Sequence, residues 1–400
     1  MMITKKLSFF LPFAIGLTMM LTGCDNEQGN TQGNTFTIEE PSLYEAYEDA
    51  FLVGTALNRA QIYGDGEEIP EHTERRDLRG YNINWSVIPE PEGLQVATHH
   101  FNAMTNENIL KWEEVHPEPG EYDFEAADRF VNIGVENDME MLGHTLVWHN
   151  QTPDWVFEDE HGETISRDAL IERMRDHIHT VVGRYEGQIQ SWDVVNEALN
   201  EDGSFRETQW YEIIGEEYLV MAYEFAHEAD PEAVLFYNDF NMEDSPEKRQ
   251  GAIDLVEMLQ ENGAPIHGIG TQSHFDLDTF PGLDAVEQTL IDFGELDLER
   301  VDVTELDIDV IPRDGELDPF ADGVPDDVLA EQTELYRNLF EIYLDHSDIV
   351  DRVTFWGVDD GGSWQNYFPE ERTNYPLLFD RDYQPKPAYD AIMELAQQRL

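Results

Sequence analysis

The segment Trp192–Asn200, WDVVNEALN, joins an apolar run that is typical of a buried strand to a polar pair, Asn196 and Glu197. A hydrophobic core normally excludes a carboxylate. In a parallel α/β barrel this conflict disappears, because the carboxyl ends of the strands open onto the functional face of the fold. We therefore interpret the segment as a barrel strand that presents Asn196 and Glu197 where it meets a pocket.

Eight apolar or β-branched segments recur along the chain, separated by amphipathic helical stretches. The candidate strands read FLVGTAL from Phe51, HHFNAMT from His99, MEMLGHTLVWH from Met139, IQSWDVVNEA from Ile189, VLFYNDFN from Val234, IHGIGTQSHF from Ile266, RVDVTELDI from Arg300 and RVTFWGVDD from Arg352. This alternation predicts an α/β fold, a (β/α)8 TIM barrel forming a single catalytic domain. A doubly wound open sheet is the alternative, although no glycine-rich phosphate loop follows the first strand.

Helical periodicity supports the same fold. Residues 169–185 place their apolar side chains on one stripe, with Ser166 as the expected N-cap, and residues 334–346 do likewise. The surplus length lies in residues 64–94 and 312–327, two long loops expected at the active-site end of the barrel.

The N-terminus reads as an export signal. Lys5 and Lys6 precede the apolar run LSFFLPFAIGLTMML, which is too short for a comfortable membrane span, and LTGC follows. LTGC resembles a bacterial lipobox, which implies cleavage before Cys24 and lipid attachment to its thiol. We expect a signal peptide over 1–23, a flexible tether over 24–37 and a catalytic domain over 38–400. The protein would then be exported and lipid-anchored to the cell envelope, without an internal disulfide because Cys24 is the only cysteine.

The charge is strongly acidic, with 23 basic against 86 acidic side chains and a net charge of −63. Such a charge repels nucleic acid and anionic membrane surfaces, so we expect neither as a partner. At roughly 1 M salt the screening length falls to about 3 Å, and acidic self-repulsion largely disappears. The composition therefore favours adaptation to high salt over an ordinary acidic protein. We expect a monomer.

Polar side chains and tryptophans gather at the predicted strand ends. In chain order they are Glu107, Asn108, Lys111, His144, Trp148, His149, Gln151, Asn196, Glu197, Asn238, Asp239, Gln272, His274, Glu305, Asp307, Trp356 and, in the following loop, Trp364. A lone histidine or carboxylate more often has a structural role. Many polar side chains gathered at one end of a barrel instead indicate a functional site. Lys248, His227 and the acidic run Asp318–Asp327 are instead interpreted as solvated surface.

Two kinds of catalytic site are disfavoured. His144 and His149 lie five residues apart on an expected strand, which would point their rings to opposite faces, and the chain has no HExxH or CxxC pattern. We therefore expect no metal and no organic cofactor. The chain also has no GxSxG nucleophile elbow of the serine-esterase type.

What remains is a pair of glutamates, Glu197 and Glu305, at two strand ends in a pocket bordered by tryptophans. Two carboxyl groups, one protonated and one ionised, are the equipment for glycoside hydrolysis, and tryptophan faces stack on sugar rings. Because ionised Glu305 disfavours ionisation of Glu197, we expect a raised pKa for Glu197.

Seven segments in register make the resemblance specific. FNAMTNENILKW, GHTLVWHNQTPDW, WDVVNEAL, YNDFN, GIGTQSHF, VTELDI and WGVDDGGSW together resemble glycoside hydrolase family 10, the retaining endo-β-1,4-xylanases, from about residue 45 to 397. Asn106, Ile109 and Leu110 depart from the usual family pattern, and residues 64–94 form a larger excursion.

The resemblance implies a role for each matching position. Glu197 matches the acid/base, Glu305 the nucleophile, and Asn196 the residue that bonds the 2-hydroxyl of the sugar at the cleavage point. His274, with Asp307 behind it, matches the relay that holds the nucleophile ionised. The residues that match substrate-binding positions are Glu107, Asn108, Lys111, His144, Trp148 and Gln151 on the glycone side, Trp356 and Trp364 as aromatic walls near the cleavage point, and Gln272.

These roles imply an endo-1,4-β-xylanase that cleaves xylan by double displacement through a covalent glycosyl-enzyme. A retaining mechanism requires the two carboxyl groups to lie about 5 to 5.5 Å apart. Two alternatives stay open: a non-catalytic lipoprotein that captures glycans, and a β-1,4-glucanase or mixed-specificity member of the same family. A glycan-capturing protein would not need the two glutamates.

Overall fold

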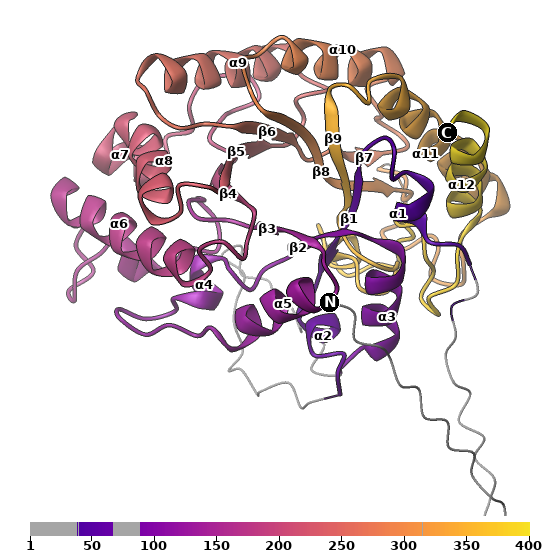
Figure 1. Ribbon diagram of the computed structural model, residues 1–400, viewed down its shortest axis with the longest axis horizontal. Helices are drawn as coiled ribbons and strands as arrows, with labels where there is room; N and C mark the ends of the chain where they lie inside the picture. The colour runs from indigo at the N-terminus through magenta and orange to yellow at the C-terminus, as the bar shows by residue number, and fades with distance from the viewer. Residues whose placement is uncertain (1–37, 39, 67–88, 314) are drawn as a thin grey trace, which may run out of the picture. The chain divides into compact units, whose positions relative to one another are not determined.

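Parallel strands surrounded by helices form the centre of the described chain (Figure 1). The computed structural model describes residues 38, 40–66, 89–313 and 315–400. The strands are β1 (Leu52–Leu57), β2 (Ala103–Asn106), β3 (Glu140–Gly143), β4 (Ser191–Asn196), β5 (Val234–Asp239), β6 (Gly268–Thr271), β7 (His274–Asp276), β8 (Arg300–Asp309) and β9 (Val350–Phe355).

The sheet closes on itself. Its order is β6-β5-β4-β3-β2-β1-β9-β8, and β6 pairs with β8 to complete the ring, while β7 pairs only with the far part of β8. Every pairing is parallel, so all carboxyl ends point to one rim of the barrel. The predicted (β/α)8 TIM barrel is confirmed, and the open-sheet alternative is excluded.

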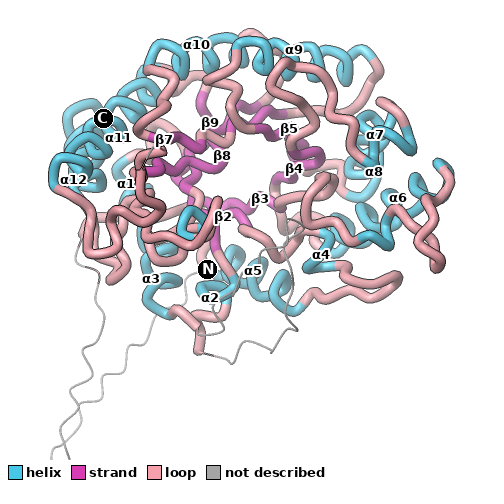
Figure 2. The backbone as a smooth tube through the Cα atoms, turned by 180° about the vertical axis from the view of Figure 1, so that it is seen from behind, coloured by secondary structure: helices cyan, strands magenta, loops and turns pink. Residues whose placement is uncertain are grey.

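Helices cover the outside of this ring (Figure 2). They are α1 (Leu43–Ala46), α2 (Arg59–Ile62), α3 (Pro91–His100), α4 (Trp112–Val115), α5 (Glu125–Glu136), α6 (Arg167–Arg184), α7 (Gln209–Ile214), α8 (Glu217–Ala229), α9 (Pro246–Glu261), α10 (Leu283–Gly294), α11 (Asp326–Asp345) and α12 (Pro387–Arg399), with the short 3₁₀ helices η1 (Asp154–Val156) and η2 (Trp364–Asn366). Ser166 caps α6 by accepting a hydrogen bond from the Ala169 amide, as predicted.

Close packing fixes β4 in the barrel. All six of its residues are buried, and the Trp192 indole lies against β3 where Gly143 has no side chain. A Cβ atom at Gly143 would overlap the indole ring. The apolar part of the opening segment is therefore core, and its polar end begins at Asn196.

Three predicted strand boundaries were wrong. His99 and His100 belong to α3, so β2 begins only at Ala103. The third strand ends at Gly143, and His144 to His149 continue as a loop. The sixth segment divides into β6 and β7 at Gln272 and Ser273, because Ser273 adopts a left-handed backbone conformation with φ of 55°.

A buried ion pair lies within the sheet of the barrel. Arg352 on β9 is fully buried and lies 2.7 Å from Asp302 on β8, and Arg300 pairs with Glu140 on β3 at 2.5 Å. Burying such charges requires close pairing, because an unpaired charge in the core is costly. The pairs fix β3, β8 and β9 relative to one another.

The predicted signal peptide, Cys24 and tether lie outside the described residues, as do residues 67–88 of the predicted excursion, and these remain predictions. The described rest of that excursion consists of residues 64–66, which follow α2, and residues 89–94, which include the start of α3. Within the described residues, no helix combines the length and the apolar character that crossing a membrane requires.

Candidate active site

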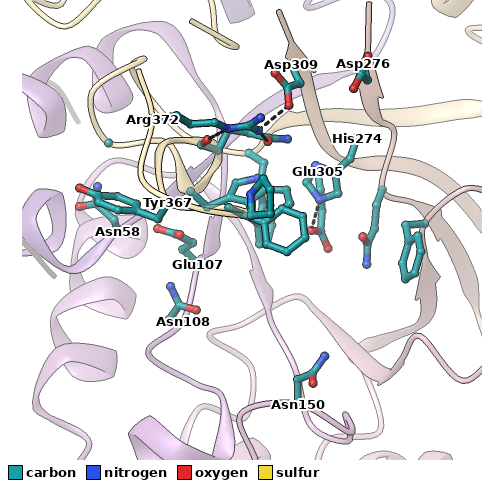
Figure 3. Close-up of a pocket in the computed structure, with 18 of the residues that line it drawn as sticks. Asn58, Glu107, Asn108, Asn150, His274, Asp276, Glu305, Asp309, Tyr367 and Arg372 are labelled. Atoms are coloured by element: carbon teal, nitrogen blue, oxygen red, sulfur yellow. Dashed lines mark hydrogen bonds and ion pairs between the residues drawn. The ribbon is translucent and has the colours of Figure 1, made fainter. Parts of the chain in front are cut away.

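The carboxyl ends of the strands surround a cleft of about 1110 Å³ (Figure 3). Thirteen of the fourteen site residues predicted for catalysis or substrate binding line it. They are Glu107, Asn108, Lys111, His144, Trp148, Gln151, Asn196, Glu197, Gln272, His274, Glu305, Trp356 and Trp364. The fourteenth, Asp307, is fully buried behind His274. The structure therefore brings the whole predicted set together.

Glu305 projects into the cleft from the middle of β8 and is almost completely buried. Its Oε1 accepts a hydrogen bond of 2.7 Å from the Asn238 side chain, and its Oε2 lies 3.0 Å from Nε2 of His274. Both oxygens thus lie within hydrogen-bonding distance of a neighbouring side chain, which fixes the orientation of the carboxyl group.

His274 connects Glu305 to a second carboxylate. Its Nδ1 lies 2.9 Å from Asp307, whose other oxygen accepts a 2.8 Å hydrogen bond from the Trp364 indole. Burial lowers the pKa of His274, but the charge of Asp307 and the bonds to both carboxylates outweigh it and raise the pKa to about 10. His274 is therefore a cation at neutral pH, held between two carboxylates.

Glu197 follows β4 with a left-handed φ of 56°. Its Oε2 accepts a 2.8 Å hydrogen bond from the Trp148 indole, and its Oε1 accepts bonds from Gln272 at 3.2 Å and Asn196 at 3.3 Å. The strained turn carries the carboxylate out of the strand and over the cleft. Glu197 is thus aimed by donors from three different loops or strands.

The predicted rise in the pKa of Glu197 was wrong. Burial raises this pKa, but the charges of His149 and Arg206 and the hydrogen bonds from Trp148 and Gln272 together bring it below its ordinary value. All of these groups stabilise the ionised carboxylate. The repulsion from Glu305 is outweighed by the donors and cations that the fold places around Glu197, which the sequence alone does not locate.

An amide network joins the two glutamates. Asn238 donates to Glu305 and, at 3.0 Å, to Oδ1 of Asn196, whose own amide nitrogen donates to Glu197. The Thr304 hydroxyl donates to Asn238 at 2.6 Å and so fixes which side of that amide faces Glu305. Asn238 lies at the end of its predicted strand, but nothing in the sequence distinguishes it from Asp239 beside it, so the sequence alone does not assign it to the site.

The loops after β2 and β3 form a second polar cluster. Nζ of Lys111 donates to Asn108 at 2.9 Å and Gln151 at 3.1 Å, and lies 4.8 Å from the centre of the Trp148 ring. Burial raises the pKa of Glu107 to about 7, against the opposing charge of Lys111. The cluster offers amide, ammonium and carboxyl groups suited to sugar hydroxyls.

His144 forms part of one wall of the cleft. Its Nδ1 lies 2.8 Å from the buried Asp193, and its ring meets the Trp356 ring edge to face at 5.1 Å. Burial lowers the pKa of His144 to about 3, so the ring is neutral. The predicted placement of His144 and His149 on a strand was wrong, because both residues follow β3 instead of lying on it. Within the described part of the chain, no group of three or more His, Cys, Asp or Glu side chains could hold a metal ion.

The assignment of Lys248 to the surface was also wrong. Its side chain is fully buried in α9, with Nζ 3.0 Å from Asp239 and 3.6 Å from the centre of the Phe240 ring. Glu201 in the loop after β4 completes the pairing at 3.2 Å. Lys248 therefore supports the end of β5 and two neighbouring loops of the cleft from behind.

Comparison with known proteins agrees with this geometry. Residues 42–395 match Glycosyl hydrolase family 10. A beta-1,4-xylanase of Dictyoglomus thermophilum is 39% identical over 396 residues, which are 98% of this chain and 100% of that protein. Endo-1,4-beta-xylanase B of Paenibacillus barcinonensis is 40% identical over 359 residues, 89% of this chain and 98% of that protein. A solved GH10 endoxylanase from a sugarcane soil metagenome superposes with a TM-score of 0.80 at 41% identity, covering 89% of this chain and 100% of the other.

Proposed function

The chain belongs to glycosyl hydrolase family 10, and from that premise we propose that it is an endo-1,4-β-xylanase in which Glu305 is the nucleophile and Glu197 the acid/base. The resemblance found in the sequence is thereby confirmed. One observation carries the assignment of roles: two buried glutamates on β8 and after β4 face one cleft, and the amides of Asn238 and Asn196 link them.

The reaction proceeds in two displacements. In the first, a carboxylate oxygen of Glu305 bonds to the anomeric carbon as the bond from that carbon to the leaving oxygen breaks, and Glu197 gives its proton to the leaving oxygen. In the second, water attacks the anomeric carbon, Glu197 takes the water proton, and the carboxylate of Glu305 is released. The glycosidic configuration is retained.

His274 and Asp307 keep Glu305 ready for attack. The His274 cation lies 3.0 Å from Glu305 and stabilises its ionised form, while Asp307 compensates the cation and fixes the ring. Asn196, between Asn238 and Glu197, is placed to donate to the 2-hydroxyl of the sugar at the cleavage point. Lys111, Asn108 and Gln151 bind hydroxyls on the glycone side.

Glu197 must acquire its proton before the first displacement. The donors and charges around Glu197 lower its pKa, so we infer that substrate binding, which excludes water and engages donors such as Gln272, favours protonation. The glycan-capturing alternative is not favoured, because a binding protein needs neither this acid nor the His274 relay.

Replacing each glutamate separately tests the roles. Glu197→Ala should retain slow turnover of an activated aryl xylobioside, with azide accelerating it by attack on the glycosyl-enzyme, because the activated leaving group needs no acid. Glu305→Ala should form no glycosyl-enzyme at all. Azide rescue of Glu305→Ala with retained configuration, or full activity of either variant on xylan, would contradict the assignment.

We further propose that the enzyme is exported and held at the bacterial envelope by a lipid on Cys24. The basic residues, apolar run and LTGC sequence that precede Cys24 support this. Metabolic labelling with a radioactive fatty acid should label the wild type and not Cys24→Ser. Equal labelling of the two proteins would exclude lipidation at this residue.

We also propose adaptation to high salt and a monomeric state. The net charge of −63 destabilises the folded chain at low salt through self-repulsion, which salt screens. Activity on acid-branched xylan, itself an anion, should therefore rise as salt is added. A steady fall in activity from zero to about 1 M salt would contradict this adaptation, since screening is nearly complete there. Sedimentation at two salt concentrations tests the monomer.

A further inference from the structure

Two carboxyl groups on the glycone side of the cleft take no part in the mechanism described above. Asp359, in the loop after β9, is buried, and Glu90, which precedes α3, is half-buried and lines the cleft. In the ring of strands, β1 lies between β9 and β2. Asn58, which follows β1, lies on the same side of the site as Glu107, with His274 on the other side (Figure 3). The Glu90–Asp359 pair therefore belongs to the end of the cleft where Glu107 is.

The Gln61 side chain connects the two carboxyl groups. It is buried in α2, and its Oε1 accepts a hydrogen bond of 3.1 Å from the backbone amide of Asn58. Its Nε2 donates to Oδ1 of Asp359 at 3.2 Å and also to Glu90. A side-chain amide has two N–H groups, so both are engaged by carboxyl groups. A Cβ atom at Gly93 would lie 3.0 Å from Cγ of Gln61, so α3 packs tightly against this side chain.

The hydrogen-bond donors around the pair are too few for two carboxylates. Oδ2 of Asp359 accepts bonds from the backbone amides of Gly361 at 2.8 Å and Gly362 at 3.1 Å. The Tyr383 hydroxyl donates to Glu90. Among the described residues, no donor reaches Oε2 of Glu90, which is a buried atom. A buried carboxylate oxygen without a donor is costly, whereas a protonated carboxyl group carries no charge, so the geometry calls for a proton on this pair.

The charges that surround the pair favour the same conclusion. Its titratable and charged neighbours are Arg59, Glu92, Glu107, Asp360, Tyr367, Tyr383 and Arg381. Arg59 is already paired with Glu114 at 2.9 Å, and Arg381 donates to Asn366 at 2.7 Å. Burial first, and then the charge of its partner, raises the pKa of Asp359 to about 7.

The pair joins two loops that shape the cleft. Gln61 and Asn58 form a reciprocal cap at the start of α2, and Asn58 lines the cleft together with Gly362. A Cβ atom at Gly362 would lie 2.9 Å from Nδ2 of Asn58 and 3.2 Å from Oδ1 of Asp359, so the loops after β1 and β9 meet here. Two residues further along, Trp364 begins η2 and lines the cleft. The contacts of the pair therefore set the position of the wall on the glycone side.

We propose that Glu90 and Asp359 hold one proton between them that keeps the loops after β1 and β9 together, and that Glu90 is thereby a positioning residue for the glycone part of the substrate. This inference rests on the proposed function. When the proton leaves for the solvent, two negative charges lie beside the Gln61 amide and repel each other. The two loops then separate, and the glycone sugars bind more weakly.

The direction of the pH dependence follows from the chemistry of the pair. Burial raises the pKa of Glu90 as well as that of Asp359. The coupled pair therefore keeps its proton in acid and loses it as the pH rises through about 7. A bound glycone, which needs the loops together, retains the proton more tightly than the free protein does. Affinity for the glycone is thus highest in acid and declines above about pH 7.

Isothermal titration calorimetry with xylobiose tests this dependence, because the binding of a two-sugar product needs no catalysis. At fixed salt, the dissociation constant should rise about tenfold between about pH 6 and about pH 9, which corresponds to a difference of one in pKa between the free and the bound pair. The pKa of Glu107 is also raised to about 7, and Glu107 is itself placed to bind the glycone. The midpoint of the rise therefore identifies the group better than its size.

Two variants should move this midpoint in opposite directions. Glu92→Gln removes a charge that raises the pKa of Glu90, so the midpoint should move to lower pH. Tyr383→Phe removes a donor that lowers this pKa, so the midpoint should move to higher pH. After burial, the pKa of Glu107 responds most strongly to Lys111, so neither change should move a midpoint that Glu107 alone produces.

Glu90→Gln gives the complementary result. It cannot lose the proton, so only the part of the rise that Glu107 contributes should remain. A full wild-type rise in Glu90→Gln, or equal midpoints in the wild type and Glu92→Gln, would overturn the inference. These two outcomes decide even if Tyr383→Phe does not fold. A wild type that binds xylobiose with the expected pH dependence but does not hydrolyse xylan would refute the proposed function alone.

Discussion

Replacing Asp307 by Asn should uncouple the relay behind the nucleophile. Asp307 accepts hydrogen bonds from both His274 and Trp364, and an amide can accept through only one of its two positions. The pKa of His274 is about 10, against an ordinary value of about 6.5. A difference of one in pKa corresponds to about 1.4 kcal/mol. The two carboxylates therefore favour the cation by roughly 5 kcal/mol. Assigning about 2 kcal/mol to Asp307 predicts a fall in the glycosylation rate of roughly 30-fold.

The pH dependence gives the sharper readout. Because the pKa of His274 is raised in the fold, the stabilisation of the fold that its charge provides is complete below about pH 6.5. Both the charge and this stabilisation are lost as the pH rises through about 10. In Asp307→Asn this pKa falls, so the rate should decline at lower pH than in the wild type. Burst kinetics with an aryl xylobioside measure the rate at each pH. Asp309→Asn is the matched control, because Asp309 is also buried on β8 but pairs with Arg372. Superimposable pH profiles for Asp307→Asn and wild type would refute the reasoning.

Three further variants test other parts of the site. His149→Gln removes a charge that lowers the pKa of Glu197. Because activity needs the protonated acid, the alkaline limb of the kcat/KM profile should move to higher pH by up to about one pH unit. An unmoved alkaline limb would count against this. Asn238→Leu removes a donor to Glu305 and should lower kcat by about 10- to 100-fold, whereas a wild-type kcat would show that the contact is dispensable. Lys248→Met leaves buried Asp239 unpaired and should lower the free energy of unfolding by about 3 to 5 kcal/mol. The loss should be smaller at pH 5 than at pH 8, because the pKa of Asp239, about 6 in the wild type, rises further without Lys248 and the carboxyl is then neutral at pH 5. An equal loss at both pH values, measured by calorimetry, would contradict this.

The sequence sufficed for the barrel and for the membership of the cleft. Eight apolar segments with helices between them fix the order of a parallel barrel, and that order alone brings Glu197 and Glu305 to one rim although they are far apart in the chain. The end of a strand can be predicted from the sequence where an apolar run gives way to polar residues. This pattern gives a wrong strand boundary where a turn interrupts an apolar run, as at Ser273, whose left-handed conformation separates β6 from β7.

Charge states required the structure. Lys248 looks like any surface lysine in a strongly acidic sequence, yet it is fully buried against Asp239, a pairing between residues on different elements. The pKa of Glu197 depends on donors and cations from the neighbouring loops, including Trp148 and Arg206, so that its direction cannot be derived from the Glu305 charge alone. Burial and contact partners depend on which elements the folded chain brings together, whereas the order of the strands follows the order of the segments in the sequence.

Direct trapping of the glycosyl-enzyme tests the central claim that Glu305 is the nucleophile of a retaining xylanase. The enzyme is incubated with a 2-deoxy-2-fluoro xylobioside carrying an activated leaving group, which slows release of the intermediate, and is then digested and analysed by mass spectrometry. We predict one xylobiosyl adduct per chain, located on Glu305 in the VTELDI segment of β8. An adduct on Glu197 or on any other residue, or hydrolysis of xylan with inverted configuration, would contradict the account.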